Sequence, residues 1–273
     1  MAKLSVLMSL YIKEKPEYAR MCFESLLNQT VPANEWVIVE DGPLTNEMYN
    51  LLKKYELNYP GLIKRVHLEK NQGLGFALKF GILECSNELI ARMDTDDIAR
   101  KDRFEKQLAM FESNPMLDIC GSNIDEFENE PEIIVAKRCV PTKHQEIIHY
   151  QRKRDAFNHM TVMFKKATVL KSGNYQPCPL MEDTFLWARM IKNGAICGNI
   201  DESLVYARIG QDMFKRRGGW GYFKRYREGK KQVLKTGLIS YTDYLLTVII
   251  QFAVALLPKN IRGLIFKKVL HKK

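Results

Sequence analysis

The stretch that most restricts the fold is a short apolar run that ends in three carboxylates. Leu89 to Met93 is too short for a typical helix, and a bounded apolar run of this length is typical of a strand covered on both faces. Asp94, Asp96 and Asp97 follow at its carboxyl end. In open α/β sheets, ligands bind at that edge. The stretch therefore predicts a buried sheet with an acidic site at its edge.

Three acids within four residues repel one another unless a partner balances their charge. A hard divalent cation such as Mg²⁺ or Mn²⁺ would do so, because it takes oxygen ligands and keeps positions open for the phosphates of a substrate. The alternative is a solvated acidic turn that caps the next helix. These three residues alone do not distinguish a metal site from a solvated turn; other parts of the sequence are needed.

Strand and helix patterns alternate along the chain, which predicts an α/β fold with a mostly parallel sheet and helices on both faces. Strands are expected at residues 4–10, 35–40, 63–68, 88–93, 118–125, 133–136 and 159–164 and around Ile196 and Val205. Helices are expected at residues 16–28, 45–55, 103–112 and 184–192, and between the glycine turn at 71–75 and Cys85. At 273 residues, the chain is long enough for one large domain with an appendage.

The last part of the chain differs in charge. From Arg208 onward, 16 Lys and Arg residues stand against 3 Asp and Glu, so that residues 208–273 hold the positive charge and residues 1–207 are near neutral. A basic helix is expected at residues 222–235, and residues 245–257 are apolar on every face. Those 13 residues fall short of the roughly 20 that a bilayer span needs. A buried core helix and an interfacial or re-entrant segment are the options, and the basic flanks favour contact with an anionic leaflet.

Two features bear on the compartment. None of the six cysteines forms a C-x-x-C pair, and Cys22, Cys85 and Cys120 lie in apolar patterns, which indicates buried free thiols of a reducing compartment. The apolar start of the chain has almost no basic residues before it and runs directly into charged residues without a small-residue cleavage site. It is interpreted as the first strand of a cytoplasmic protein.

Four segments, taken in order, carry a resemblance to a known family. They are the apolar strand that leads to Ser9-Leu-Tyr11, Trp36 to Gly42, the glycine turn Asn71 to Gly81 with the acids that follow it, and Met181 to Arg189. Their order and spacing over residues 3–207 resemble glycosyltransferase family 2, the inverting transferases with a GT-A fold. A D-x-D motif alone is weak evidence, whereas the ordered set is specific. Within the family, the chain most resembles enzymes of bacterial O-antigen and capsular polysaccharide assembly.

The resemblance implies substrates, a cofactor and a location. The donor would be a UDP-sugar carrying glucose or galactose, the acceptor an undecaprenyl-diphosphate-linked GlcNAc, and the product a β-linked sugar. The cofactor would be Mn²⁺ or Mg²⁺. The enzyme would lie peripherally on the cytoplasmic face of the inner membrane. Nucleic acid is not expected as a partner, since the apolar 245–257 segment argues against it.

The resemblance also assigns the donor site. Asp96 would be the metal ligand, and Asp94 would contact the ribose or the metal and its water shell. Asp97 is the third acid, with capping of the next helix as the alternative role. Asp41 would bind the nucleotide, an acceptor-only carboxylate being suited to uracil N–H or ribose hydroxyls; its alternative is a turn-forming Asp-Gly pair.

The remaining nucleotide contacts would come from other segments. Ser9 and Tyr11 would contact the base. The family's usual Ala-Arg-Asn is Ala77-Leu-Lys79 here, so Lys79 either replaces the missing arginine or lies on a solvated face.

Asp183 is the candidate general base, because inversion requires a carboxylate opposite the leaving group. Its place at a helix start is expected to lower its pKa and keep it ionised; the alternative is a helix cap. Further candidates for the acceptor or the phosphates are Glu182, His159, Arg189, Arg216 and Arg217. Glu182 is otherwise a solvated acid, His159 a structural histidine, and residues 215–217 a solvated basic loop, whereas Arg189 is expected to pair with a phosphate. Trp187 is expected in the core.

Two other classes compete with this interpretation. A metal-dependent phosphatase also places D-x-D after a strand, but it requires a second acidic motif downstream that the sequence lacks, and it leaves the glycine turn at Asn71 unexplained. A lipid- or nucleic-acid-binding module based on the basic tail would not need the acids. The intact set of acids therefore favours the transferase.

Overall fold

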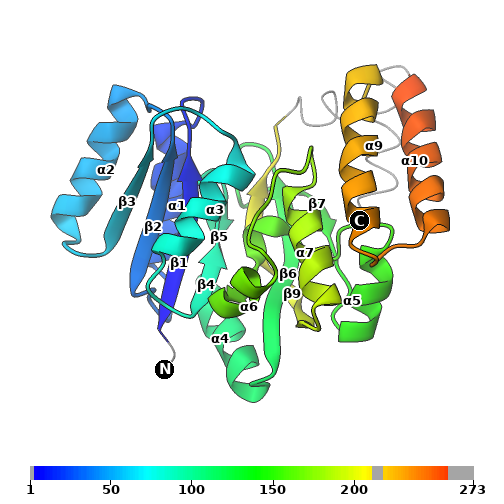
Figure 1. Cartoon of the computed structure of the whole chain (residues 1–273). Helices are drawn as coiled ribbons and strands as arrows, with labels where there is room; N and C mark the ends of the chain where they lie inside the picture. The colour runs from blue at the N-terminus through cyan, green and yellow to red at the C-terminus, as the bar shows by residue number, and fades with distance from the viewer. Residues whose placement is uncertain (1–2, 211–217, 258–273) are drawn as a thin grey trace.

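The structure, a computed structural model, describes residues 3–210 and 218–257, and it centres on one mixed sheet with helices on both faces (Figure 1). The strands are β1 Leu4–Leu10, β2 Glu35–Asp41, β3 Ile63–Leu68, β4 Leu89–Arg92, β5 Ile98–Ala99, β6 Leu117–Phe127, β7 Ile134–Arg138, β8 Met163–Lys165 and β9 Ile196–Arg208. The helices are α1 Pro16–Leu27, α2 Asn46–Asn58, α3 Leu74–Glu84, α4 Arg103–Ser113, α5 His144–Gln151, α6 Lys166–Lys171, α7 Glu182–Lys192, α9 Trp220–Lys235 and α10 Tyr241–Leu256, with a 3₁₀ turn η1 at His159–Thr161. The expected α/β class is confirmed.

The first four long strands are parallel and lie in the order β3-β2-β1-β4. Their residues are almost all buried in β1, β2 and β4, as expected for strands covered on both faces. In register, Leu10 lies opposite Glu40, and Leu7 lies opposite Arg92. The carboxyl ends of these strands, with the residues that follow them, therefore meet at one edge of the sheet.

Two apolar clusters cover the two faces of the sheet. One combines the inward faces of α1, α2 and α4 with Trp36 and Met163, and the other combines α3 and α7 with Phe164 and Trp187. Gly81 lets α3 approach the sheet closely, because a Cβ there would lie 2.3 Å from Leu7 Cδ1. The expected core position of Trp187 is confirmed.

Some elements differ from the sequence-based expectation. The strand expected at residues 159–164 begins only at Met163, because residues 159–161 form η1, in which the Thr161 hydroxyl donates to the Asn158 carbonyl at 2.8 Å. The two strands expected around Ile196 and Val205 are one strand, β9, which pairs with β6 on both sides of a register shift at Ser122–Asn123. The exposed Asp201-Glu202 pair in its middle made the pattern look interrupted. The short helices α5 and α6 were not expected.

The C-terminal helices α9 and α10 form a hairpin beside α7 (Figure 1). The hairpin begins at Trp220, and the expected basic and apolar helices both lie in it. Among the described helices, none combines the length and the apolar content that crossing a bilayer requires. All six cysteines are free, and five of them are buried, whereas Cys139 is exposed.

Candidate active site

The sheet edge carries a cavity of about 310 Å³ at the carboxyl ends of β1, β2 and β4. Its lining consists of Ser9, Tyr11, Glu14, Asp41, Asn71, Gly73, Leu74, Asp94, Thr95 and Asp96. The structure thus brings together Ser9, Tyr11, Asp41, Asp94 and Asp96, which come from three separate segments of the chain. Each of these five predicted donor-site residues lines the cavity.

Asp41 shapes the glycine turn that closes one side of this cavity. Its two carboxylate oxygens accept hydrogen bonds from the backbone N–H groups of Gln72 and Gly73 at 2.7 and 2.9 Å. Gly42 has a φ of +84°, and a Cβ there would lie 2.6 Å from the backbone nitrogen of Asn71, so only glycine fits. Asp41 therefore lines the cavity and also fixes the turn beside it.

The acid cluster is compact enough to hold one cation. One carboxylate oxygen from each of Asp94, Asp96 and Asp97 lies within 4.8 Å of the others. Burial and the neighbouring Asp94 raise the pKa of Asp96 to about 6, and burial raises the pKa of Asp97 well above its usual range. Glu14 also lines the cavity, and burial with the charges of Asp96 and Asp94 raises its pKa to about 7. A divalent cation would relieve this repulsion, and an all-oxygen donor set suits Mg²⁺ or Mn²⁺.

Asp97 plays a different part from the expected helix cap. Its Oδ1 accepts a hydrogen bond from the backbone N–H of Arg208 at 2.8 Å, which joins the acidic turn to the end of β9. Its Oδ2 is buried and has no hydrogen-bond partner among the described residues. The capping position of α4 is taken by Asp102 instead. The capping alternative for Asp97 is therefore wrong.

Arg92 is a buried cation under this edge that the sequence reasoning did not single out. Its side chain forms an ion pair with Asp94, whereas Nε and Nη1 have no hydrogen-bond partner in the described part of the chain. Burial raises the pKa values of Glu182 and Asp183, and the charge of Arg92 offsets part of that rise, so Arg92 faces both groups of acids. The sequence signal that could have identified Arg92 is a single charged residue inside an apolar strand.

Asp183 lies in the first turn of α7, as expected, but its electrostatics differ from the expectation. Its Oδ1 accepts a hydrogen bond from the backbone N–H of Thr184 at 2.7 Å. Burial, followed by the charges of Asp155 and Glu182, raises its pKa to about 7. The expected lowering by the helix terminus is wrong, because burial and two like charges outweigh that dipole. A carboxylate with a pKa near neutrality is well matched to general-base catalysis.

His159 lies beside Asp183 rather than in a separate site. The distance from its Nδ1 to Asp183 Oδ2 is 3.9 Å, and its Nε2 lies 2.7 Å from the hydroxyl of Tyr175. Burial and the charge of Arg92 lower the pKa of His159 well below its usual range, so the ring is neutral. Tyr175 and Asp155 were not predicted from the sequence, since both lie in irregular segments without a motif.

The other candidates have varied surroundings. The guanidinium of Arg189 donates to the carbonyl oxygens of Ser172, Asn174 and Phe185, so it braces the loop before α7. These contacts give Arg189 a structural role, and its pairing with a phosphate stays a prediction. Lys79 lines a second cavity that shares Gly73 and Leu74 with the first and reaches Glu182. Arg216 and Arg217 lie outside the described residues.

The fold and the site together define a class of protein. A mostly parallel sheet whose edge carries a cluster of D-x-D acids, with a partly buried carboxylate at the start of a facing helix, is the arrangement of a nucleotide-sugar-dependent glycosyltransferase with a GT-A fold. The sequence model of the family described as Glycosyl transferase family 2 matches residues 5–171. The chain belongs to glycosyltransferase family 2.

Relatives of known description agree with this assignment. The chain is 36% identical over 272 residues to the UDP-Gal:alpha-D-GlcNAc-diphosphoundecaprenol beta-1,3-galactosyltransferase of Escherichia coli, with 99% of this chain and 97% of that protein covered. It is 38% identical over 268 residues to the amylovoran biosynthesis glycosyltransferase AmsE of Erwinia amylovora, with 97% and 98% covered. The resemblance to enzymes of bacterial polysaccharide assembly is confirmed.

A solved structure supports the fold. The mannosyltransferase PcManGT from Pyrobaculum calidifontis, solved in complex with GDP-Man and Mn²⁺, superimposes with a TM-score of 0.64 over 96% of this chain and 72% of that chain. The two sequences are 12% identical, so the likeness concerns the fold.

Proposed function

We propose that this protein transfers a hexose from a UDP-sugar to the GlcNAc of a diphosphate-linked undecaprenol, with inversion to a β-linkage. We favour galactose over glucose as the transferred sugar. The observation that carries the proposal is the 36% identity to the Escherichia coli galactosyltransferase over nearly the full length of both chains. The site supports it, because one edge of the sheet combines a cavity, an acid cluster and a separate base.

The donor side uses the acid cluster and the glycine turn. Asp96 and Asp94 would hold Mn²⁺ or Mg²⁺, which when bound acts as a Lewis acid on the diphosphate oxygens. Ser9, Tyr11 and Asp41 line the same cavity and would hold the nucleoside. Lys79 lies next to this cavity, where its cation could meet a phosphate.

The acceptor side uses Asp183. Its carboxylate removes the proton from the acceptor hydroxyl while that oxygen attacks the anomeric carbon of the sugar. The bond between the sugar and the diphosphate breaks, and UDP leaves with the electron pair. Asp183 then releases its proton to water. Glu182, the residue before it, would orient the acceptor sugar by accepting hydrogen bonds from its hydroxyls.

The test of this proposal uses purified full-length protein, Mn²⁺, a synthetic lipid-diphosphate–GlcNAc acceptor and a panel of UDP-sugars. Mass spectrometry should show the mass gain of one hexose from UDP-Gal, and the gain should disappear with a chelator. Glycosidase digestion of the product establishes the linkage. Transfer from another donor alone would overturn the galactose assignment, and transfer that persists in the chelator would overturn the metal requirement.

The pH dependence of transfer follows from the raised pKa of Asp183. Only the ionised carboxylate is a base, so with a pKa of about 7 the rate should fall as the pH drops through neutrality rather than near pH 4. Asp155→Asn removes the largest neighbouring charge that raises this pKa and keeps an oxygen to accept from Thr184. We expect its acidic limb to move to lower pH, while the charges of Glu182 and Arg92 are unchanged.

This profile is measured as kcat at saturating Mn²⁺ and donor, so that titration of Glu14 and Asp96 does not enter through metal binding. Glu146→Gln, which changes an exposed acid in the first turn of α5, is the matched control. An acidic limb that is the same in Asp155→Asn and in the wild type would contradict the assignment of Asp183 as the titrating base.

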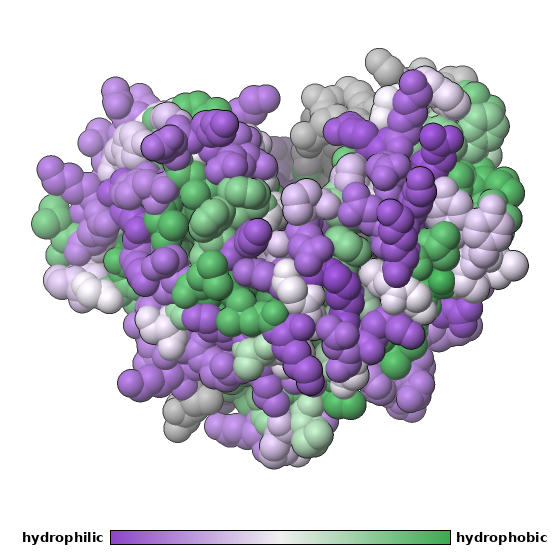
Figure 2. All heavy atoms as spheres, in the orientation of Figure 1, coloured by the Kyte–Doolittle hydropathy of each residue, from purple (hydrophilic) through white to green (hydrophobic). Residues whose placement is uncertain are grey.

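The hairpin is the proposed membrane contact, at the cytoplasmic face. Figure 2 shows apolar side chains along the outer edge of the molecule over α10, next to the hydrophilic α9. The exposed apolar residues of α10 are Leu245, Leu246, Ile249, Ile250, Phe252 and Leu256. The exposed cations of α9 are Lys224, Arg225, Arg227, Lys231 and Lys235. An apolar face beside a row of cations suits an anionic bilayer surface.

Ile249→Asp/Ile250→Asp should reduce binding to phosphatidylglycerol-containing vesicles by tenfold or more, since each apolar side chain contributes about 1.5–3 kcal/mol on burial. Co-flotation measures the bound fraction. Leu57→Asp changes an equally apolar residue of α2 that is 71% exposed and far from the hairpin, and it should bind as the wild type does (Figure 1). Equal binding by all three proteins would exclude α10 as the contact.

A further inference from the structure

The loop before the proposed base has an unfavourable backbone conformation. Leu180, in the segment 178–181 that leads into α7, has a φ of +64°. Few residues other than glycine adopt the left-handed region, and for a bulky residue it costs on the order of 1–3 kcal/mol. Such a conformation persists only where the surrounding structure holds it. Contacts with a neighbouring element must therefore stabilise this loop, which directly precedes Glu182 and Asp183.

Helix α9 is the element that contacts the loop. A Cβ on Gly229 would lie 2.3 Å from the carbonyl oxygen of Pro179 and 3.3 Å from the sulfur of Met181, so the backbones of helix and loop touch at this point. The thiol of Cys178 lies 3.6 Å from the Gly229 carbonyl, which accepts from it. Glycine inside a helix costs about 1 kcal/mol relative to alanine. Glycine at position 229 allows the helix to approach Pro179 this closely, which offsets that cost.

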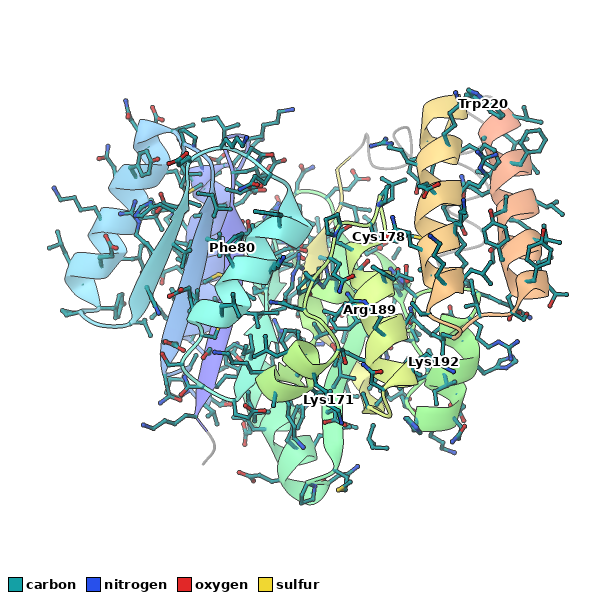
Figure 3. All side chains as sticks on the ribbon, viewed as in Figure 1. Phe80, Lys171, Cys178, Arg189, Lys192 and Trp220 are labelled. Carbon is teal, nitrogen blue, oxygen red and sulfur yellow. The ribbon has the colours of Figure 1, made fainter. Side chains whose placement is uncertain are left out.

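A third apolar cluster surrounds this contact between α9 and the loop. Its buried members come from the loop, from α7 and from the hairpin: Cys178, Met181, Ala188, Val233 and Ile239. In Figure 3, Cys178 lies on the loop that faces α9, and Arg189 marks the neighbouring α7. The cluster is distinct from the two that cover the sheet. The hairpin is thus packed against the base-bearing segment rather than against the nucleotide pocket.

A second, polar connection runs behind the base. Lys230, which is only 3% exposed, donates from Nζ to the carbonyl oxygen of Arg152 at 3.3 Å. The Arg152 side chain in turn pairs with Asp243 of α10 at 2.6 Å. Three residues further on, the Asp155 carboxylate accepts a hydrogen bond from the hydroxyl of Thr184, the residue after Asp183. The hairpin therefore holds both segments that border Asp183.

We propose that the α9–α10 hairpin is a positioning element of the catalytic site. In it, Gly229 packs against the loop that presents Asp183 to the acceptor, and Lys230 holds the segment from Arg152 to Asp155 behind the base. This inference rests on the proposed role of Asp183 as the base. The hairpin makes no contribution to the cavity lined by Ser9, Asp41 and Asp96 within the described residues. Its loss should therefore affect the chemical step and leave the nucleotide site intact.

The test compares Gly229→Ala with Gly221→Ala in the full-length protein. Both exchange a glycine of α9, but in the described structure a Cβ at Gly221 would meet nothing within 4 Å. We expect Gly229→Ala to lower kcat with UDP-Gal about tenfold or more, because displacements of about 1 Å at a reacting group have effects of this size. The Kd for UDP with Mn²⁺ should stay within twofold. Gly221→Ala should match the wild type in both.

A positioning role also predicts a change that mere loss of active protein would not produce. Displacing the loop exposes Asp183 to water, so its pKa falls and the acidic limb of kcat in Gly229→Ala moves to lower pH. Lys230→Met is the second variant should Gly229→Ala fold poorly, and its control is Lys54→Met, which changes an exposed lysine of α2. Lys230→Met should also lower kcat and leave the Kd for UDP unchanged.

Two results would overturn the inference. One is a kcat within twofold of the wild type in both Gly229→Ala and Lys230→Met. The other is a parallel loss of kcat and UDP affinity, which would indicate general damage. Asp183→Asn separates this failure from failure of the proposed function: if that variant is inactive while both hairpin variants are normal, only the positioning role falls. If Asp183→Asn is active, the base assignment falls with it.

Discussion

Asp183→Asn is expected to lower kcat for sugar transfer by about 10³-fold, within the range of about 10²–10⁴ that general-base catalysis contributes. The amide has nearly the same shape as the carboxylate, but it cannot take the proton of the acceptor hydroxyl. Its oxygen can still accept the hydrogen bond from the Thr184 N–H, so the start of α7 should remain folded. Steady-state kinetics with saturating UDP-Gal and acceptor measure kcat.

The binding of UDP and Mn²⁺ to Asp183→Asn should stay within about twofold of the wild type, because Asp183 does not line the nucleotide cavity. Isothermal titration calorimetry checks this. Glu84→Gln, at the end of α3, controls for the loss of one carboxylate away from the site. Turnover within tenfold of the wild type would show that Asp183 is not the base, and Glu182 would be the next residue to replace.

Asp96→Asn is expected to remove metal-dependent nucleotide binding, which Asp183→Asn leaves intact. Asp96 lines the cavity, and its carboxylate lies within 4.8 Å of those of Asp94 and Asp97. An amide carries no charge and binds a hard cation far less well than a carboxylate does. We expect the Kd for UDP in Mn²⁺ to rise to the value that the wild type shows in a chelator, and kcat/KM to fall by about 10²-fold or more.

Calorimetric titration of UDP with Mn²⁺ and with a chelator gives the four affinities that this comparison needs. Asp102→Asn is a suitable control, since Asp102 lies on the same segment and pairs with Lys106 rather than with the cluster. An Asp96→Asn protein whose UDP affinity still depends on Mn²⁺ would move the metal to other ligands. Asp94, already paired with Arg92, would then have to bind it with Glu14 or Asp97.

Much of the fold could be predicted from the chain, because its signals are local. Buried runs such as Leu4–Leu10 and Glu35–Asp41 are long and apolar, and turn residues such as Gly42 end them. The predictions were wrong where tertiary pairing overrides the local pattern. Exposed Asp201 and Glu202 interrupt the apolar pattern of β9, yet the strand continues because β6 pairs with it again from Ser203 onward, after a register shift.

The site residues that belong to sequence motifs could be predicted. Asp94 and Asp96 follow a strand, Asp41 follows another, and Asp183 begins a helix, so that each was visible as an acid at the end of an element. Arg92 was passed over as part of an apolar run. Tyr175 and Asp155 have no motif at all and come beside the base only through the fold. A single sequence contains no signal for such encounters.

By itself, the sequence determined the order of strands and helices, the acidic sheet edge and the family, because hydrophobic periodicity and ordered motifs are properties of neighbouring residues. Only the tertiary structure decided the electrostatics and the support of the base. Burial and the charges of Asp155 and Glu182 raise the pKa of Asp183 to about 7, the reverse of what a helix terminus does. Gly229 meets Pro179 only after the hairpin has packed on α7. Burial and long-range contact depend on groups far apart in the chain, and only the folded protein brings those groups together.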